Sequence, residues 1–345
     1  MQKFKIILIV LLLCAFTFQL SVAQNIKPVH PKYELPKLES FNDGAAKTRI
    51  LDFVKNAVNP NSAGFIKPED RIACFDNDGT LWCEQPLPAQ AYFAFDRIKK
   101  LAKDHPEWAN QQPFKSVLED DFKTLTLLPK SEIFKVIATA ESVDDVENFD
   151  AVVNEWMKTS KHPKYGIPFV KLVYQPMMEV LAYLRSNGFK IFIVSGGSTE
   201  FMRAWAPELY NIPKEQVIGS TMKLDAKQSG DSIMIKRLPE LEFNDDHIGK
   251  AISIEKFIGK KPVIVFGNSD GDLEMMEYAY FQQKPKLMVY VKHTDGEREY
   301  FYDDKTAYGK LVKGEVIANK YDWTIIDMKR DWKTVFKRGF SNSKK

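Results

Sequence analysis

Cysteine and histidine are scarce in this sequence. Its 345 residues include three cysteines and five histidines. The cysteines lack the spacing of a metal site, and isolated histidines are more often structural than ligands, so we assign neither type to a metal. Cys14 lies in a segment that we expect to be removed. Cys74 should lie inside a strand and Cys83 beyond the turn that follows it. That separation is too large for a disulfide, so we predict two free thiols.

An excess of charge of one sign is also missing. The chain has 49 Lys and Arg residues against 46 Asp and Glu residues, for a formal net charge of +3. It contains no basic block of the kind that binds nucleic acid, so we predict no nucleic-acid partner. Hydrophobic residues make up 44% of the chain. This is an ordinary globular composition, sufficient for a sizeable core.

The apolar run near the start of the chain is too short for a confident membrane span. Ile6–Phe16 follows a basic start, Met1–Lys5, and precedes Ser21-Val22-Ala23. Small residues therefore occupy both positions that a signal peptidase reads. We predict that residues 1–23 are a cleaved signal peptide. The protein is then secreted or periplasmic, with no stable membrane anchor. The alternatives are an uncleaved anchor and a lipoprotein attached at Cys14, although the residue before Cys14 is not small.

Short apolar runs that end in polar loops indicate parallel strands. Such runs alternate with helical patterns, which predicts an α/β fold with a Rossmann-like parallel sheet and helices on both faces. We expect an extended tether over residues 24–40 and the core domain over residues 41–85 and 175–345. The predicted strands are Arg71–Phe75, Phe189–Val194, Pro262–Phe266, Lys286–Val291 and Trp323–Ile326.

A long stretch between the first two predicted strands contains no convincing strand pattern. Residues 86–174 instead have helical periodicity. An insertion at the carboxyl end of a strand tends to cover a site located there. We therefore predict an α-helical cap over residues 86–174, with a decoration remote from any site as the alternative. The expected helices are Ala89–Ala102, Phe114–Leu125, Ser131–Ala140 and Ser142–Thr159.

The first predicted strand ends in the sequence Asp76-Asn77-Asp78-Gly79-Thr80. Two carboxylates two residues apart can converge on one cation or one phosphate. One of them could attack phosphorus, while the other protonates the leaving oxygen and later deprotonates water. A calcium loop is the alternative, but an EF-hand has its glycine at the sixth loop position, and here glycine is the fourth.

Three further segments carry the chemistry that phosphate transfer needs. Ser195-Gly196-Gly197 follows the second strand and offers a hydroxyl and backbone N–H groups to an anion. Lys250 opens a predicted helix and can neutralise charge on transferring oxygens. The loop Gly267–Asp272 follows the third strand and is rich in the oxygen ligands that Mg²⁺ prefers. Each signal is weak or moderate alone, but three of the four segments follow strands of one sheet.

Taken together, these segments make the chain resemble the haloacid dehalogenase superfamily. It is most similar to the phosphoserine-phosphatase-like branch, which has a helical cap after the first motif. The resemblance covers roughly Arg71–Tyr280. It implies a Rossmann-like core, a Mg²⁺ cofactor and an aspartyl-phosphate intermediate.

The resemblance also implies a role for each motif residue. By this match Asp76 is the nucleophile, Asp78 is the general acid and base, and Lys250 holds the nucleophile and the phosphate. The expected phosphate-binding residues are Thr80, Ser195 and Gly196, and the expected metal ligands are Asp76, Asp78 through its backbone carbonyl, Asn268 and Asp272.

The fourth motif departs from the commonest family pattern, because Asn268 stands where an aspartate is usual. Its carbonyl oxygen can still bind Mg²⁺ with one charge fewer, or Asp270 can replace it. On this basis the sequence predicts that Asn268→Asp tightens Mg²⁺ binding.

The expected function is that of an exported, Mg²⁺-dependent phosphatase acting on a small phosphate monoester. A phosphotransferase or mutase on the same fold is the alternative, and a metal-independent dehalogenase is a weaker one. Glu84, just past the first motif, either contacts the leaving group or is a solvated loop carboxylate.

Overall fold

The computed structural model describes residues 37–143 and 146–337. The predicted signal peptide and most of the predicted tether lie outside these residues. The described residues form one compact unit. Leu38 is fully buried, and Ser40 Oγ donates a hydrogen bond to Glu179 Oε1 at 2.7 Å. The packed domain thus begins before the boundary predicted at residue 41. None of the helices described is long and apolar enough to span a bilayer.

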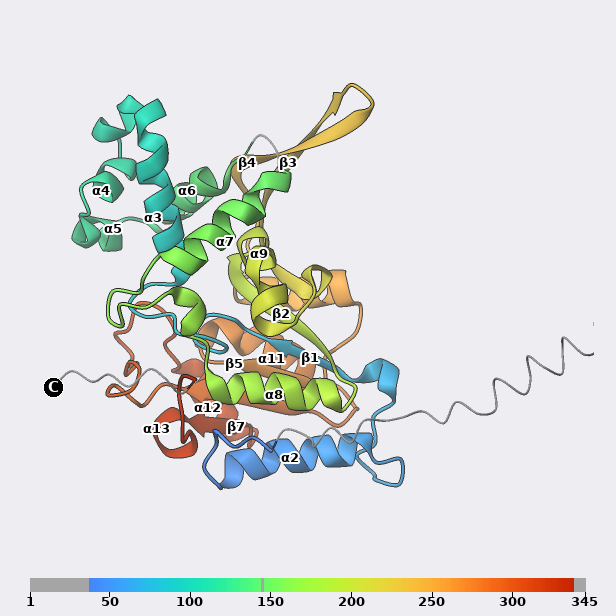
Figure 1. The fold of residues 1–345 in the computed structure, drawn as a ribbon. Coiled ribbons are helices and arrows are strands. Elements are labelled where there is room, and N and C mark those ends of the chain that lie inside the picture. Colours follow the sequence, from blue (N-terminus) through green and yellow to red (C-terminus); the bar gives the residue numbers. More distant parts are fainter. Residues whose placement is uncertain (1–36, 144–145, 338–345) are drawn as a thin grey trace, which may run out of the picture. The chain divides into compact units, whose positions relative to one another are not determined.

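A seven-stranded sheet in the order β4-β3-β2-β1-β5-β6-β7 forms the centre of the fold (Figure 1). Every neighbouring pair is parallel except β3 and β4, which are antiparallel. The predicted Rossmann-like α/β class is confirmed. The strands are β1 Ile72–Phe75, β2 Lys190–Ser198, β3 Val217–Ser229, β4 Ser232–Phe243, β5 Ile264–Gly267, β6 Leu287–Lys292 and β7 Thr324–Asp327.

Both faces of the central strands are buried, which explains their continuous apolar sequences. In β1, Ala73 and Phe75 face one core, to which α2 (Ala45–Val58) and α8 (Gln175–Ser186) contribute. Ile72 and Cys74 face the opposite core, formed with α11 (Leu273–Tyr280) and α12 (Lys313–Lys320). Helices thus cover both faces of the sheet, as predicted. The remaining helices of the core are α9 Thr199–Tyr210, α10 Ile248–Ser253 and α13 Met328–Asp331.

The β3–β4 hairpin was not predicted from the sequence. Its strands are joined by Gly230 and Asp231, with Gly230 at φ +59°. Only the first residues of β3 are buried, whereas Leu224 is 52% exposed and Ile233 is 67% exposed. Figure 1 shows the outer part of the hairpin extending beyond the parallel strands.

Among the described residues between β1 and β2, every regular element is helical. The longer helices are α3 Ala89–Leu101, α4 Phe114–Leu118, α5 Phe122–Leu127, α6 Lys130–Glu141 and α7 Phe149–Thr159. The single helix predicted over Phe114–Leu125 is two helices, because Asp120 adopts φ +55° and Asp121 caps α5 by accepting from Thr124 N. The helix predicted from Ser142 begins at Phe149.

The insertion has its own apolar core and also packs on the rest of the domain. Phe95, Trp108 and Val136 belong to its separate buried cluster. On another face of α3, Phe93 contacts Phe201 of α9 with ring centroids 5.2 Å apart. Ser198 N, at the end of β2, donates to Gln90 Oε1 at 3.0 Å. The insertion is therefore attached beside the carboxyl ends of the parallel strands.

Candidate active site

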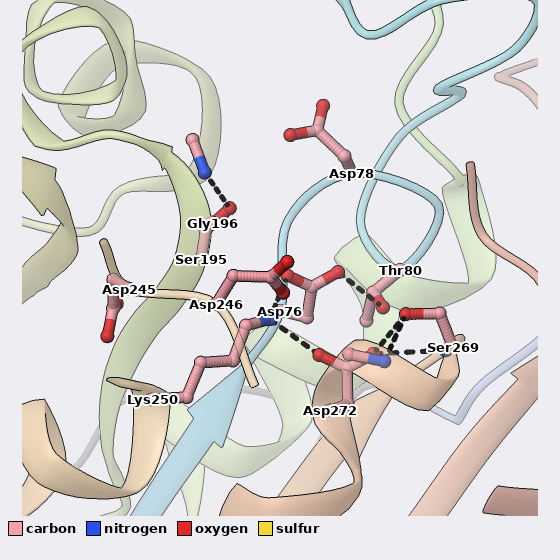
Figure 2. A network of polar contacts seen from close by, with 12 residues as sticks. Asp76, Asp78, Thr80, Ser195, Gly196, Asp245, Asp246, Lys250, Ser269 and Asp272 are labelled. Carbon is pink, nitrogen blue, oxygen red and sulfur yellow. Dashed lines mark hydrogen bonds and ion pairs between the residues drawn. The ribbon is translucent and has the colours of Figure 1, made fainter. Parts of the chain in front are cut away.

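The sheet order brings the predicted motifs together. β1 lies between β2 and β5, so the polar residues that follow these strands meet at one edge. The ladder continues to the site, because Asp76 N donates to Phe266 O of β5 at 2.9 Å. Lys250 reaches the same edge from α10 (Figure 2). Residues separated by 174 positions in sequence, Asp76 and Lys250, are in direct contact.

Lys250 lies at the centre of the polar network. Its Nζ donates to Asp76 Oδ1 at 2.6 Å and to Asp272 Oδ1 at 2.5 Å, and all three residues are buried. Burial lowers the pKa of Lys250, but the two carboxylates outweigh burial and the net change is upward. The ammonium group therefore stays charged and fixes the position of Asp76.

The carboxylate of Asp76 is held on both oxygens. Oδ1 accepts from Lys250, and Oδ2 lies 3.3 Å from the donor Thr80 Oγ1. Burial and the nearby Asp272 raise the pKa of Asp76 to about 8, although Lys250 acts in the opposite direction. A further positive charge beside Asp76 would favour its ionised form.

Asp78 points away from the Lys250 network (Figure 2). Its Oδ1 accepts from Trp82 Nε1 at 2.7 Å. Its Oδ2 faces the end of β2, where a Cβ added to Gly197 would lie 3.6 Å away. Burial raises the pKa of Asp78. The two aspartates therefore differ in their partners: Asp76 is paired with Lys250, whereas Asp78 accepts from Trp82 and lies outside the lysine network.

The turn of the first motif requires glycine at position 79. Gly79 has φ +76°, and a Cβ there would lie 2.0 Å from Asn268 Nδ2. The turn places Thr80 Oγ1 between Asp76 Oδ2 and Asn268 Oδ1, at 3.3 and 3.2 Å. Thr80 therefore connects the first motif with the fourth.

Ser195 and Gly196 lie beside this network at the end of β2, which extends through Ser198 rather than ending at Val194 as predicted. Ser195 is buried, and its Oγ accepts from Gly197 N at 3.2 Å. Gly196 contacts the core through its carbonyl, which accepts from Ser220 Oγ at 2.8 Å. The hydroxyl and the glycine backbone thus form a compact turn next to Asp76.

The polar residues of the fourth motif, in the loop Gly267–Asp272, have different partners. Asp272 Oδ2 accepts from the backbone N–H groups of Asn268 and Ser269 at 2.9 and 3.0 Å, while Oδ1 accepts from Lys250. These donors occupy Asp272, which therefore holds the loop and the lysine in place. Asp270 Oδ1 accepts from Val312 N and Gly314 N at the start of α12. Asn268, and not Asp270, shares the Thr80 hydroxyl with Asp76.

Glu84 is a site residue whose burial and partner the sequence did not reveal. It is buried, and its Oε1 accepts from Asn268 Nδ2 at 2.8 Å. Burial, with Asp78 and Asp76 nearby, raises the pKa of Glu84 well above its usual value. The expectation of a solvated loop carboxylate is wrong, and the polar contact found is with Asn268. No local signal marks a contact that spans 184 positions of sequence.

His293, which is distant from the first motif in sequence, contacts its backbone directly. Its Nε2 donates to the carbonyl of Gly79 at 2.7 Å, and its Nδ1 lies 3.1 Å from Glu299 Oε2. Tyr174 Oη donates to the other oxygen of Glu299 at 3.1 Å. The segment between β6 and β7 thus holds the turn that carries Asp78 and Gly79.

The donor set fits a hard divalent cation. Within the described ranges, no group of three or more His, Cys, Asp and Glu side chains is arranged to hold a metal ion. Of the four predicted ligands, Asp272 is engaged by Lys250 and by two loop N–H groups. The other three offer one carboxylate from Asp76, the backbone carbonyl of Asp78 and the amide oxygen of Asn268. Mg²⁺ prefers oxygen ligands and keeps several waters. Lys250 is shared by two buried carboxylates, Asp76 and Asp272, so a second positive charge beside Asp76 suits the charge of the site.

Comparisons with known proteins agree with this geometry. The family model of haloacid dehalogenase-like hydrolase matches residues 73–277, and the resemblance seen in the motifs is confirmed at the level of this family. A search of curated proteins found no match.

Some solved structures have a similar fold at low sequence identity. A conserved protein of unknown function from Anaerococcus prevotii DSM 20548 is 15% identical with a TM-score of 0.49, over 72% of this chain and 86% of that one. A protein of unknown function from Bordetella pertussis Tohama I is 13% identical with a TM-score of 0.48, over 75% and 98%. A phosphoserine phosphohydrolase-like protein from Francisella tularensis is 18% identical with a TM-score of 0.35, over 64% and 87%. Likenesses at these scores carry no functional argument.

Proposed function

Because the chain belongs to the haloacid dehalogenase-like hydrolase family, we propose that it is an exported, Mg²⁺-dependent phosphatase acting on a small phosphate monoester. One observation carries this proposal. Asp76 is fixed by Lys250 at 2.6 Å, while Asp78, two residues further, lies outside that network and accepts from Trp82 Nε1. One carboxylate fixed as a nucleophile and a second carboxyl free to exchange a proton are what an in-line displacement with acid assistance needs.

The reaction follows in two displacements. An oxygen of Asp76 forms a bond to phosphorus as the ester P–O bond breaks, and Asp78 gives its proton to the departing alkoxide. In the second step Asp78 takes a proton from water, the water oxygen bonds to phosphorus, and the bond from phosphorus to Asp76 breaks. Inorganic phosphate leaves, and both aspartates return to their starting states.

The other site residues orient the nucleophile and balance charge. Lys250 holds Asp76 and stabilises charge on the transferring oxygens. Ser195 Oγ and the backbone around Gly196 would contact the remaining phosphate oxygens. Mg²⁺, when bound by Asp76, the Asp78 carbonyl and Asn268, supplies positive charge to the nucleophile and the phosphate. Thr80 keeps Asp76 and Asn268 in register through contacts of 3.3 and 3.2 Å.

Two other reactions use the same family scaffold. Carbon–halogen cleavage needs no second acid. The presence of Asp78, a carboxyl whose pKa is raised by burial, therefore argues against a dehalogenase. A phosphotransferase or mutase would share the first step and protect the aspartyl-phosphate from water. Free phosphate release separates these outcomes.

The test is phosphate release from a panel of phosphate monoesters, with Mg²⁺ and with EDTA. We expect release with Mg²⁺ only, and none from Asp76→Asn, an isosteric variant that cannot form the aspartyl-phosphate. Mass spectrometry of acid-quenched wild-type enzyme should place the added phosphate on Asp76. Full activity of metal-free enzyme or of Asp76→Asn would refute the proposal, and transfer to an alcohol without free phosphate would indicate a phosphotransferase.

A further inference from the structure

The hydrogen bond between Glu84 and Asn268 is enclosed by backbone on two sides. Asn268 is 2% exposed and Glu84 is 5% exposed. A Cβ added to Gly79 would lie 2.0 Å from Asn268 Nδ2 and 2.3 Å from Glu84 Oε1. A Cβ added to Gly309, which has φ +79°, would lie 2.0 Å from the same Glu84 oxygen. The two glycines leave room for this contact and for nothing larger.

Glu84 determines which end of the Asn268 amide faces Asp76. Glu84 Oε1 is the acceptor in this contact, and an amide has one accepting and one donating end. With Nδ2 donating to Glu84 at 2.8 Å, Oδ1 is directed to Thr80 Oγ1 at 3.2 Å, on the side of Asp76. The flipped amide would set Oδ1 against the Glu84 carboxylate and present N–H groups to the cation position. Both contacts of the flipped form would be repulsive.

The loop that carries Glu84 is itself fixed. Gln85 Nε2 donates to Tyr308 O at 2.8 Å, and His162 Nε2 donates to Gln85 O at 2.7 Å. Glu84 is thereby held between the first motif and the segment that contains Gly309. A carboxylate positioned so firmly can impose an orientation on its partner rather than adapt to it.

We propose that Glu84 is a positioning residue for the metal: by accepting from Asn268 Nδ2 it orients the Asn268 carbonyl toward the cation. The pair then replaces the single aspartate usual at position 268 in the family pattern. This inference rests on the proposed Mg²⁺ site. It differs from the sequence expectation that Glu84 contacts the leaving group. It also means that Asn268→Asp alone should not tighten Mg²⁺ binding, contrary to the prediction made from the sequence.

A double-mutant cycle on Mg²⁺ affinity tests this proposal. Mg²⁺ binding to full-length enzyme without substrate is measured by calorimetry for wild type, Glu84→Gln, Asn268→Asp and the double variant. Loss of an outer-shell partner typically weakens metal binding about 10- to 100-fold, so Glu84→Gln should fall in this range. Asn268→Asp alone sets two carboxylates in contact and should gain no affinity. The double variant exchanges amide and carboxylate, keeps the hydrogen bond and the charge, and should recover most of the loss.

Glu141→Gln is the matched control, because Glu141 is also a buried carboxylate that accepts from an amide, Gln90 Nε2 at 2.6 Å. Its Mg²⁺ affinity should equal that of wild type. Thermal unfolding in EDTA confirms that each variant is folded. Unchanged affinity in Glu84→Gln, or additive effects of the two substitutions, would overturn the proposal while leaving the phosphatase assignment intact. Failure of wild type to bind Mg²⁺ would overturn both.

Discussion

At the scale of single residues, the two aspartates of the first motif are separated by their contacts. Asp76 accepts from Lys250, whereas Asp78 accepts from Trp82 Nε1 at 2.7 Å. Asn at position 78 would keep the Trp82 bond and the backbone carbonyl, and would lose only the proton. The structure therefore offers a variant that removes acid–base assistance alone.

We predict that Asp78→Asn slows hydrolysis of alkyl phosphates by about a hundred- to ten-thousand-fold, the usual contribution of general acid–base catalysis. Nitrophenyl phosphate has a good leaving group and needs less protonation, so the first step should continue while water attack is slow. Quenched-flow mass spectrometry should then detect phosphate accumulating on Asp76, and Mg²⁺ affinity should match wild type. An Asp78→Asn enzyme that turns over alkyl phosphates normally would remove Asp78 from the mechanism.

The sequence identified most of the residues that meet at the site, because strand ends followed by Asp, Ser, Asn and Gly are local patterns. It named Glu84 but not its partner Asn268, 184 positions away, and it did not find His293, whose partner Gly79 is 214 positions away. It also could not show that Asp272 is engaged by Lys250 and loop N–H groups, or that Asp270 contacts the start of α12. Those distinctions depend on side-chain direction, which the motif does not encode.

At the scale of elements, the insertion is joined to the core by a buried carboxylate. Glu141, at the end of α6, accepts from Ser198 Oγ at 2.5 Å and from Gln90 Nε2 at 2.6 Å. Burial raises the pKa of Glu141 to about 7, against the opposing effects of Ser198, Arg237 and Gln90. This contact connects α6 of the insertion to the end of β2, the strand that carries Ser195.

The pKa of Glu141 predicts how stability depends on pH. Because the folded pKa lies above the unfolded value, the folded protein binds the proton more tightly, and the free energy of unfolding falls as pH rises from about 4.5 to about 7. Gln at position 141 stays neutral, so the free energy of unfolding of Glu141→Gln should not fall in this way. The loss in wild type is at most roughly 3 kcal/mol. The unfolding temperature of Glu141→Gln, measured relative to that of wild type, should therefore be higher at pH 8 than at pH 5. Glu119→Gln, at an exposed position of the insertion, should show no such trend; a pH-independent difference for Glu141→Gln would contradict the prediction.

The strands that the sequence predicted are those buried on both faces, since burial leaves a continuous apolar run. The β3–β4 hairpin was not predicted because most of it is exposed. In β3 the residues from Lys223 to Ser229 are exposed and mostly polar. A signal was present: Gly230-Asp231 is a two-residue turn between Gln228-Ser229 and Ser232-Ile233. The predicted helix ends in the insertion also differ from the observed ones, because interruptions of a helix, such as the one at Asp120, are determined by packing and capping.

At the scale of the whole molecule, both cysteines of the described domain are free and buried, as predicted. Cys74 lies in β1 and Cys83 lies beyond the first-motif turn, with its Sγ near Gln85 O at 3.6 Å. Burial raises the pKa of each thiol. Low thiolate content and burial both oppose oxidation, so these thiols can persist in an oxidising compartment.

Counting thiols therefore tests the proposed export of the chain. The sequence contains three cysteines, and cleavage after Ala23 would remove Cys14. Native protein isolated from its host should show no thiol that reacts rapidly, and two after denaturation without reductant. Intact mass should correspond to a chain that begins at Gln24. Three thiols with Met1 retained would mean that the leader is not cleaved, and a lipid mass on Cys14 would mean a lipoprotein. Fewer than two thiols would mean that Cys74 or Cys83 is oxidised, so that its burial does not protect it.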